Sequence, residues 1–78
     1  MPKGTHSQRL LRYMVDCFYT EKGQIERFRK ESFPIKVSGE PEAINAAKRM
    51  AFGKKPHHFH VRAIGSKGDT VIFSSEYN

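Results

Sequence analysis

The stretch 40–53 is the one part of this chain whose apolar spacing predicts a helix. Its apolar side chains follow the i, i+3/i+4, i+7 spacing of a single buried stripe: Ala43, Ile44, Ala47, Met50 and Ala51. Most of these side chains are small, so the helix can lie close to a sheet. Pro41 is expected at the first helical position, and Gly53 in the left-handed conformation that ends a helix. One short helix in 78 residues leaves most of the core to be built from strands.

Two strand-like segments precede the helix and are predicted to form a hairpin. The first, 9–20, alternates between two faces, and one face carries Leu11, Tyr13, Val15, Cys17 and Tyr19. Residues 21–23 fit a three-residue turn, with Gly23 at the position that needs a positive φ. The return strand is 24–37, with a bulge near 29–32; a short helical turn there is the alternative. Pro34 cannot donate to a strand ladder, which favours an edge position.

Two further strand-like segments follow the helix. Residues 57–64 alternate clearly, 65–69 are rich in turn residues, and 70–75 carry the last apolar run. The predicted fold is α+β: a four-stranded, mainly antiparallel sheet (ββαββ) with one amphipathic helix packed on one face. Residues 1–8 are expected to be a flexible lead-in, and 9–78 a single domain.

A single helix covers one face of such a sheet and leaves the other face to solvent, a partner or a second copy. Strand alternation predicts the residues of this open face. They are Arg12, Met14, Asp16, Phe18, His58, His60, Arg62, Thr70, Ile72 and Ser74.

The net charge of +6 favours an anionic partner, and nucleic acid is the principal candidate. The best cationic cluster is Lys48, Arg49, Lys54 and Lys55, because one helix end and the following loop bring them together. Arg12 and Arg62 add charge on the open face. The side chains expected to supply contact area, partly by stacking on unpaired bases, are Phe18, Phe52, His58 and His60. The simpler alternative for each lysine is a solvated surface charge without a binding role.

The run His57-His58-Phe59-His60 is the one motif whose side chains could bind a metal ion or take part in catalysis. Alternation places His58 and His60 on one face and His57 on the other. Two histidines can chelate a metal ion, but the further candidates Cys17, Asp16 and His6 have no signature spacing, so no metal site is expected. A second interpretation makes the histidines acid and base in RNA cleavage. Exposed strand histidines without a role are the simplest interpretation.

The composition indicates the cellular compartment of the protein. A single cysteine excludes an internal disulfide framework and fits a reducing compartment. No apolar run reaches the ~18 residues of a membrane span, and the start of the chain lacks the apolar core of a signal peptide. A cytoplasmic protein without a cofactor is therefore expected.

The run 35–75 resembles the layout of small phage-encoded inhibitor proteins, including some basic anti-CRISPR proteins whose sheet wraps on one helix. The resemblance rests on Ile35-Lys36-Val37, on Ala47-Lys48-Arg49-Met50-Ala51 and on Phe59-His60-Val61-Arg62-Ala63-Ile64. It covers about half of the chain, and no functional residue is carried over from it. It implies a non-enzymatic protein that binds a large nucleoprotein complex.

The sequence thus favours a small basic protein that binds nucleic acid or a nucleoprotein complex and has no enzymatic activity. The first alternative is a protein-binding inhibitor or adaptor without nucleic-acid contact, including a homodimer through the open sheet face. The second alternative is a small histidine-dependent ribonuclease. No membrane partner is expected.

Overall fold

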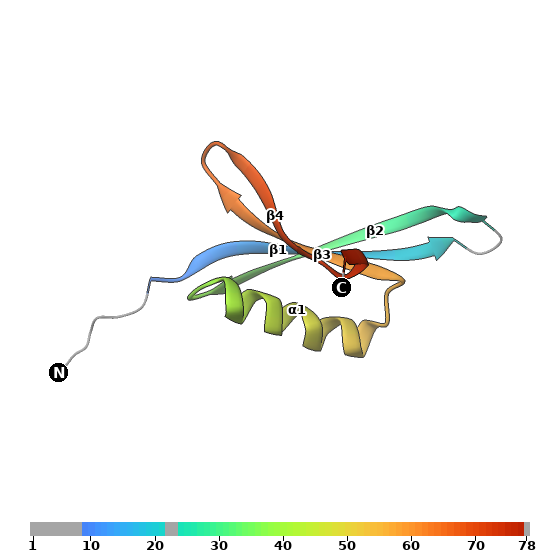
Figure 1. The fold of residues 1–78 in the computed structure, drawn as a ribbon, viewed down its shortest axis with the longest axis horizontal. Helices are drawn as coiled ribbons and strands as arrows, with labels where there is room; N and C mark the ends of the chain where they lie inside the picture. Colours follow the sequence, from blue (N-terminus) through green and yellow to red (C-terminus); the bar gives the residue numbers. More distant parts are fainter. Residues whose placement is uncertain (1–8, 22–23, 78) are drawn as a thin grey trace.

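A computed structural model of the chain describes the backbone of residues 9–21 and 24–77, and the side chains of residues 9–20 and 28–76. Its elements are β1 (Leu11–Glu21), β2 (Gln24–Val37), α1 (Glu40–Lys54), β3 (His58–Gly65), β4 (Gly68–Ser74) and the short 3₁₀ helix η1 (Ser75–Tyr77). The strands form one antiparallel sheet in the order β2-β1-β3-β4. The helix lies against one face of this sheet (Figure 1), so the predicted ββαββ architecture is confirmed.

Strand β2 forms one edge of the sheet, as the presence of Pro34 predicts. The bulge predicted near 29–32 is wrong, because β2 pairs with β1 in regular register from Phe28 to Val37. The register shift lies instead between Thr20 and Glu21 of β1, next to the connection between the two strands. Residues 25–27 of β2 lie opposite this shift and have no pairing partner among the described residues of β1. The predicted turn residue Gly23 lies outside the described residues.

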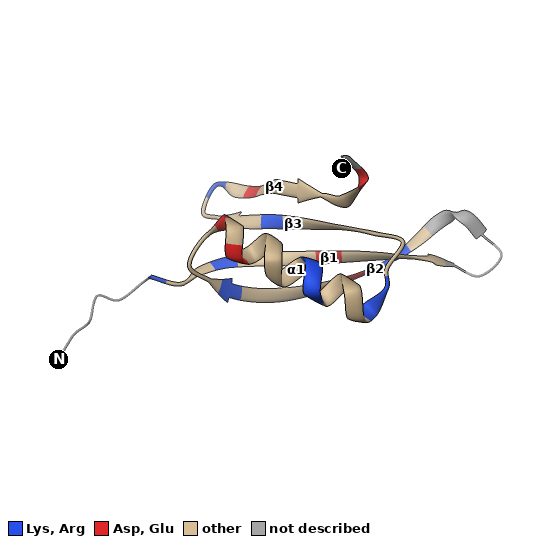
Figure 2. Cartoon of the chain, turned by 60° about the horizontal axis from the view of Figure 1, so that its bottom comes forward, with Lys and Arg blue, Asp and Glu red and all other residues tan. Residues whose placement is uncertain are grey.

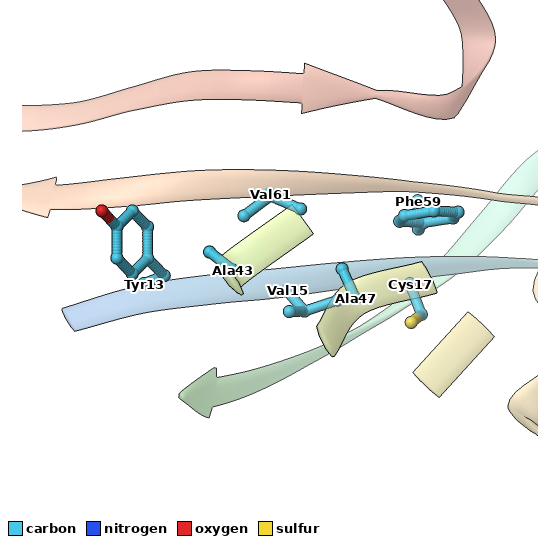
Figure 3. Packing of buried hydrophobic residues seen from close by; sticks show 7 residues of the cluster. All are labelled: Tyr13, Val15, Cys17, Ala43, Ala47, Phe59 and Val61. Atoms are coloured by element: carbon cyan, nitrogen blue, oxygen red, sulfur yellow. The ribbon is translucent and has the colours of Figure 1, made fainter. Parts of the chain in front are cut away.

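The core lies between α1 and the two central strands (Figure 3). Its buried apolar residues are Tyr13, Val15, Cys17, Ala43, Ala47, Phe59 and Val61. The side chains of Ala43 and Ala47 are fully buried and face the sheet, which confirms the predicted stripe of small residues. Because a methyl group is all that separates these helical positions from the strands, the helix lies close to the sheet.

The helix ends differ from the sequence expectation by one or two residues. Gly39 is the N-cap, which makes Pro41 the second helical residue rather than the first. Gly53 stays helical, and Lys55 instead takes the left-handed conformation, with φ 55° and ψ 52°. Its backbone N–H donates to the carbonyl oxygen of Ala51 at 2.7 Å. Pro56 explains the position of this end, because a residue before proline is disfavoured in the right-handed helical region.

The left-handed Lys55 leads to a stability prediction. Replacing Lys55 with glycine should raise the free energy of unfolding by about 0.5–1 kcal/mol, because a side chain with a Cβ is strained at this φ. The matched control is Arg49→Gly, which places glycine at an exposed position inside the helix and should lower stability by about 1 kcal/mol. Urea denaturation of both variants measures the two changes. A loss of stability in Lys55→Gly would contradict this description of the helix end.

A β-bulge in the β3–β4 pair changes which residues of β4 face the helix. The register shift lies between Val61 and Arg62, so Val71 stands opposite Arg62 on the open face. The prediction that Thr70 and Ile72 lie on the open face is therefore wrong: Thr70 pairs with a helix-side residue of β3, and Ile72 packs against the core. Alternation in the sequence assumes a regular ladder, and an extra residue in one strand inverts it.

Candidate functional site

The predicted site residues lie on two opposite surfaces of the molecule. The helix surface comprises residues of α1 and its C-terminal end: Lys48, Arg49, Phe52, Lys54 and Lys55. The sheet surface lies on the face that α1 leaves uncovered and includes Arg12, Phe18, His58, His60 and Arg62. The helix and the sheet separate the two groups, so they do not form a single continuous patch.

Phe52 is the most exposed large apolar side chain among the described residues, at 85% exposure. It projects from the outer face of α1, three residues after Arg49 and three before Lys55. Figure 2 shows that basic residues occupy the second half of the helix, whereas its acidic residues lie in the first turn. Among the described side chains, Lys48, Arg49 and Lys55 form no ion pair with a carboxylate. The exposed ring thus shares the helix with basic residues that form no ion pair among the described side chains.

Two lysines of the expected cluster lean toward opposite edges of the sheet. The Lys48 ammonium lies 5.4 Å from the ring centroid of Phe73 in β4. The Lys54 ammonium lies 4.4 Å from the ring centroid of Phe33 in β2. Since β4 and β2 are the two edge strands, these charges flank the helix on both sides. The helix surface is therefore a cationic band across α1 and not a single compact cluster.

A network of ionised groups occupies the middle of the sheet surface. The carboxylate of Asp16 accepts hydrogen bonds from Arg62 Nε at 2.6 Å and Nη2 at 2.9 Å, and from Ser32 Oγ at 2.6 Å. Arg62 Nη1 also donates to Asp69 at 2.7 Å. Asp16 is only 2% exposed, although it belongs to the face that the sequence predicted to be open. The charge of Arg62 is therefore already engaged by two carboxylates.

This network lowers the pKa of Asp16. Burial alone would raise the pKa of the Asp16 carboxyl, but the hydrogen bonds from Arg62 and Ser32 and the charge of Arg62 outweigh it. The same hydrogen bond to Asp16 raises the pKa of Arg62. Both groups are consequently held in their charged forms.

The aromatic and imidazole rings of the sheet surface contact one another. Phe18 and His58 stack at a centroid distance of 4.5 Å and an interplanar angle of 7°, and His60 lies tilted 4.9 Å from Phe18. Phe28 meets His58 edge-on at 4.9 Å. The ring faces that strand alternation suggested for base stacking are thus in contact with each other. Phe18 and His58 supply less free stacking surface than Phe52 does.

His58 is not the exposed strand histidine of the simplest interpretation. It is 9% exposed, and burial lowers the pKa of its imidazole, which favours the neutral form. His57 was predicted on the opposite face, and this is wrong: its ring lies 5.1 Å from Phe28, and its Nδ1 lies 3.0 Å from Nδ1 of His58. His57 precedes β3, so strand alternation does not govern its direction.

Sequence reasoning missed Glu76. The short helix η1 brings its carboxylate to 4.0 Å from His58 Nε2 and 3.7 Å from His60 Nε2. The pairing of His60 with Ser74 places Glu76 just beyond the two histidines. A correct β4 register would have revealed this position.

The metal ligands weighed from the sequence do not join this group. Cys17 faces the helix side of the sheet, where burial raises the pKa of its thiol, and Asp16 is bound by Arg62. His6 lies outside the described residues.

An apolar hollow of about 450 Å³ lies at the other end of the sheet surface. Met14, Pro34 and Ile64 contribute to its lining, and the cationic side chains of Arg12 and Lys36 are also part of it. The Asp16–Arg62 network separates this hollow from the histidines along the strands. The sheet surface thus offers two chemically different regions.

Comparison with known proteins gave no match for this chain among protein-family models, curated proteins or solved structures. The resemblance to phage-encoded inhibitors therefore stays a prediction. No helix in the described part of the chain has the length and apolar character needed to cross a membrane.

Proposed function

We propose that this protein binds nucleic acid, free or within a nucleoprotein complex, through the helix surface and without cleaving it. The observation that carries the proposal is the exposed ring of Phe52 on a helix whose cations Lys48, Arg49 and Lys55 form no ion pair with any carboxylate of the described side chains. An exposed aromatic face of this kind is the type of platform on which single-stranded nucleic acids stack their bases.

The two components of the helix surface match the two components of a nucleic acid. Arg49, Lys48 and Lys55 supply charge for the phosphates, and binding through them releases counterions. Phe52 supplies a ring face on which an unpaired base can stack, which is worth about 1–3 kcal/mol per base. A single strand satisfies both components, because its bases are not already stacked in a duplex. We therefore expect single-stranded nucleic acid to bind more tightly than a duplex.

The proposal is tested by fluorescence anisotropy with labelled single- and double-stranded DNA and RNA across a salt series. The variant Lys48→Gln/Arg49→Gln/Lys55→Gln should lose at least tenfold in affinity at ~50 mM salt. Its salt slope should be smaller by about 2, since each phosphate contact to a single strand contributes about 0.7. Phe52→Ala should weaken binding to single strands about fivefold or more and leave the salt slope unchanged.

The matched control is Arg12→Gln/Lys36→Gln/Lys67→Gln, which removes the same charge from exposed positions away from the helix surface. It should bind nearly as well as the unmodified protein. Equal losses in both triple variants would show that only the net charge matters, and the helix surface would then be discarded. Because we propose binding without cleavage, labelled RNA should remain intact after incubation with the protein.

The apolar hollow favours a second candidate, an inhibitor or adaptor that binds a protein. Its apolar lining and the positive charges of Arg12 and Lys36 suit an acidic segment with an apolar side chain. In this case the roles of the two triple variants would be reversed. The helix variant would keep its partner, and the variant at Arg12, Lys36 and Lys67 would lose it.

A further inference from the structure

Three potential metal ligands converge at the end of the sheet surface nearest the C-terminal turn. His58 and His60 project from the same face of β3, and Glu76 approaches them from η1. One ligand atom from each residue lies within 4.8 Å of the other two. Bound to one ion at ~2.0–2.1 Å in tetrahedral geometry, such atoms would be about 3.4 Å apart. Glu76 Oε1 lies 3.7 Å from His60 Nε2 and Glu76 Oε2 lies 4.0 Å from His58 Nε2, both slightly wider than this.

Glu76 is the most exposed of the three proposed ligands. The side chain of Glu76 is 49% exposed and can change its rotamer, whereas both imidazoles contact the ring of Phe18. The side chain of His60 is 26% exposed, so an ion can reach the group from solvent. A shift of the carboxylate by about half an ångström, which is within ordinary side-chain motion, would bring its oxygens to bonding separations from the two imidazole nitrogens. The two imidazole nitrogens themselves lie at most 4.8 Å apart.

The surroundings of His58 orient Nε2 as a metal ligand. Its Nδ1 lies 3.0 Å from Nδ1 of His57, a distance at which one ring donates a hydrogen bond to the other. When His58 donates from Nδ1, its Nε2 carries a lone pair directed toward the Glu76 carboxylate. A hydrogen bond from the remote ring nitrogen is the usual support of a ligating histidine. The stacked ring of Phe18 further fixes the plane of this imidazole.

The backbone that carries Glu76 is anchored to the strand that carries the histidines. The backbone N–H of Phe59, between His58 and His60, donates to Ser75 Oγ at 2.9 Å. The backbone N–H of Glu76 lies 3.3 Å from Ser74 Oγ, to which it donates. These hydrogen bonds hold η1 beside β3 whether or not an ion is bound. The backbone segments that carry the three proposed ligands are therefore already held together before an ion binds.

We propose that His58, His60 and Glu76 bind one divalent transition-metal ion, with Zn²⁺ as the best match. Two imidazole nitrogens and a carboxylate oxygen suit Zn²⁺ and its neighbours Ni²⁺ and Cu²⁺ better than Mg²⁺ or Ca²⁺, which prefer all-oxygen ligand sets. Three protein ligands leave a fourth position for water or a donor from a partner. The proposal is independent of nucleic-acid binding, since the helix surface lies on the opposite side of the sheet.

The test is isothermal titration calorimetry of the metal-free protein with ZnCl₂. One equivalent should bind, and Co²⁺ in its place should give the intense visible absorption of a four-coordinate ion. Glu76→Gln removes the carboxylate at an exposed position and should weaken Zn²⁺ binding at least tenfold. His60→Ala should do the same. Because His58 is buried, its replacement is left out, so that a loss of folding is not mistaken for a loss of binding.

The matched control is His6→Ala, which removes an imidazole without changing the three proposed ligands. It should bind Zn²⁺ as tightly as the unmodified protein. His57→Phe should lower the affinity tenfold or more, because it removes the support of Nδ1 in His58 but no ligand. Two results would overturn the proposal: the absence of binding at ~100 μM Zn²⁺, or an affinity that Glu76→Gln and His60→Ala leave unchanged. Circular dichroism of each variant establishes that the sheet is intact.

Discussion

Replacing Asp16 with alanine should lower the free energy of unfolding by about 3 kcal/mol, the largest effect expected of a polar substitution in this protein. The change removes the acceptor of three hydrogen bonds from Arg62 and Ser32. Arg62, with a side chain only 26% exposed, would lose the partner that offsets its desolvation. Breaking such a pair from one side costs about 3–5 kcal/mol when the pair is buried. For a domain of this size, the corresponding fall in Tm is about 12–24 °C.

Asp69→Ala is the matched control, because it removes a second carboxylate from the same guanidinium. The Asp69 side chain is 34% exposed, and exposed pairs contribute only about 0–1 kcal/mol. The double variant Asp16→Leu/Arg62→Met should recover much of the stability, since no unpaired charge remains. Thermal and urea unfolding of the four proteins complete the comparison. Equal small losses in Asp16→Ala and Asp69→Ala would refute the special role of Asp16.

The same carboxyl predicts a pH dependence whose sign follows from its lowered pKa. A depressed pKa in the folded state stabilises the protein above the ordinary Asp pKa of 3.8. This contribution is lost as the pH falls below that value and through the lowered pKa. The unmodified protein should therefore lose stability from about pH 4 downward more steeply than Asp16→Ala does. The difference between their urea midpoints, measured from pH 6 to pH 2, should shrink toward acid.

Ala47→Leu should be almost as damaging, for a steric reason. Ala47 is fully buried where α1 contacts the sheet, and Val15 and Val61 of the central strands are also fully buried there. Three added carbon atoms have no space unless the helix moves away from the strands. Overpacking of this kind typically lowers the free energy of unfolding by about 1–3 kcal/mol, and we expect a loss of about 3 kcal/mol at this position. Urea denaturation measures the loss.

Asn45→Leu is the control for Ala47→Leu, because it introduces the same side chain on the exposed outer face of α1. Its stability should change by less than about 0.5 kcal/mol. If the two leucine variants were equally stable, the close approach of helix and sheet would be contradicted. Circular dichroism should show the same helix content in Asn45→Leu as in the unmodified protein.

The layout of the fold was predictable because periodicity is a local property of the sequence. Alternation from Tyr13 to Cys17 and the small-residue stripe of Ala43 and Ala47 both correspond to buried faces in the structure. The misplaced features depend on pairing between strands. Thr70 and Ile72 were assigned to the wrong face because a bulge opposite Val61 and Arg62 leaves no trace in alternation alone.

The candidate sites differ in the same way. The exposure of Phe52 follows from its helical position, so the sequence identified it as a contact residue. The group of His58, His60 and Glu76 joins residues from two segments and requires the register of β4. The engagement of Arg62 by Asp16 likewise joins positions 46 residues apart, which no local pattern indicates.

The sheet order also determines how this chain folds. Each of its two hairpins, β1–β2 and β3–β4, closes locally, whereas the central β1–β3 pairing joins the two halves of the chain across the whole of α1. Closing a long loop costs entropy before distant contacts compensate for it. The joining of the two hairpins is therefore the slow step expected in folding. The hydrogen bond between Asp16 and Arg62 joins these two strands, so we expect it to form after the transition state of folding. It should then lower the rate of unfolding more than it raises the rate of folding.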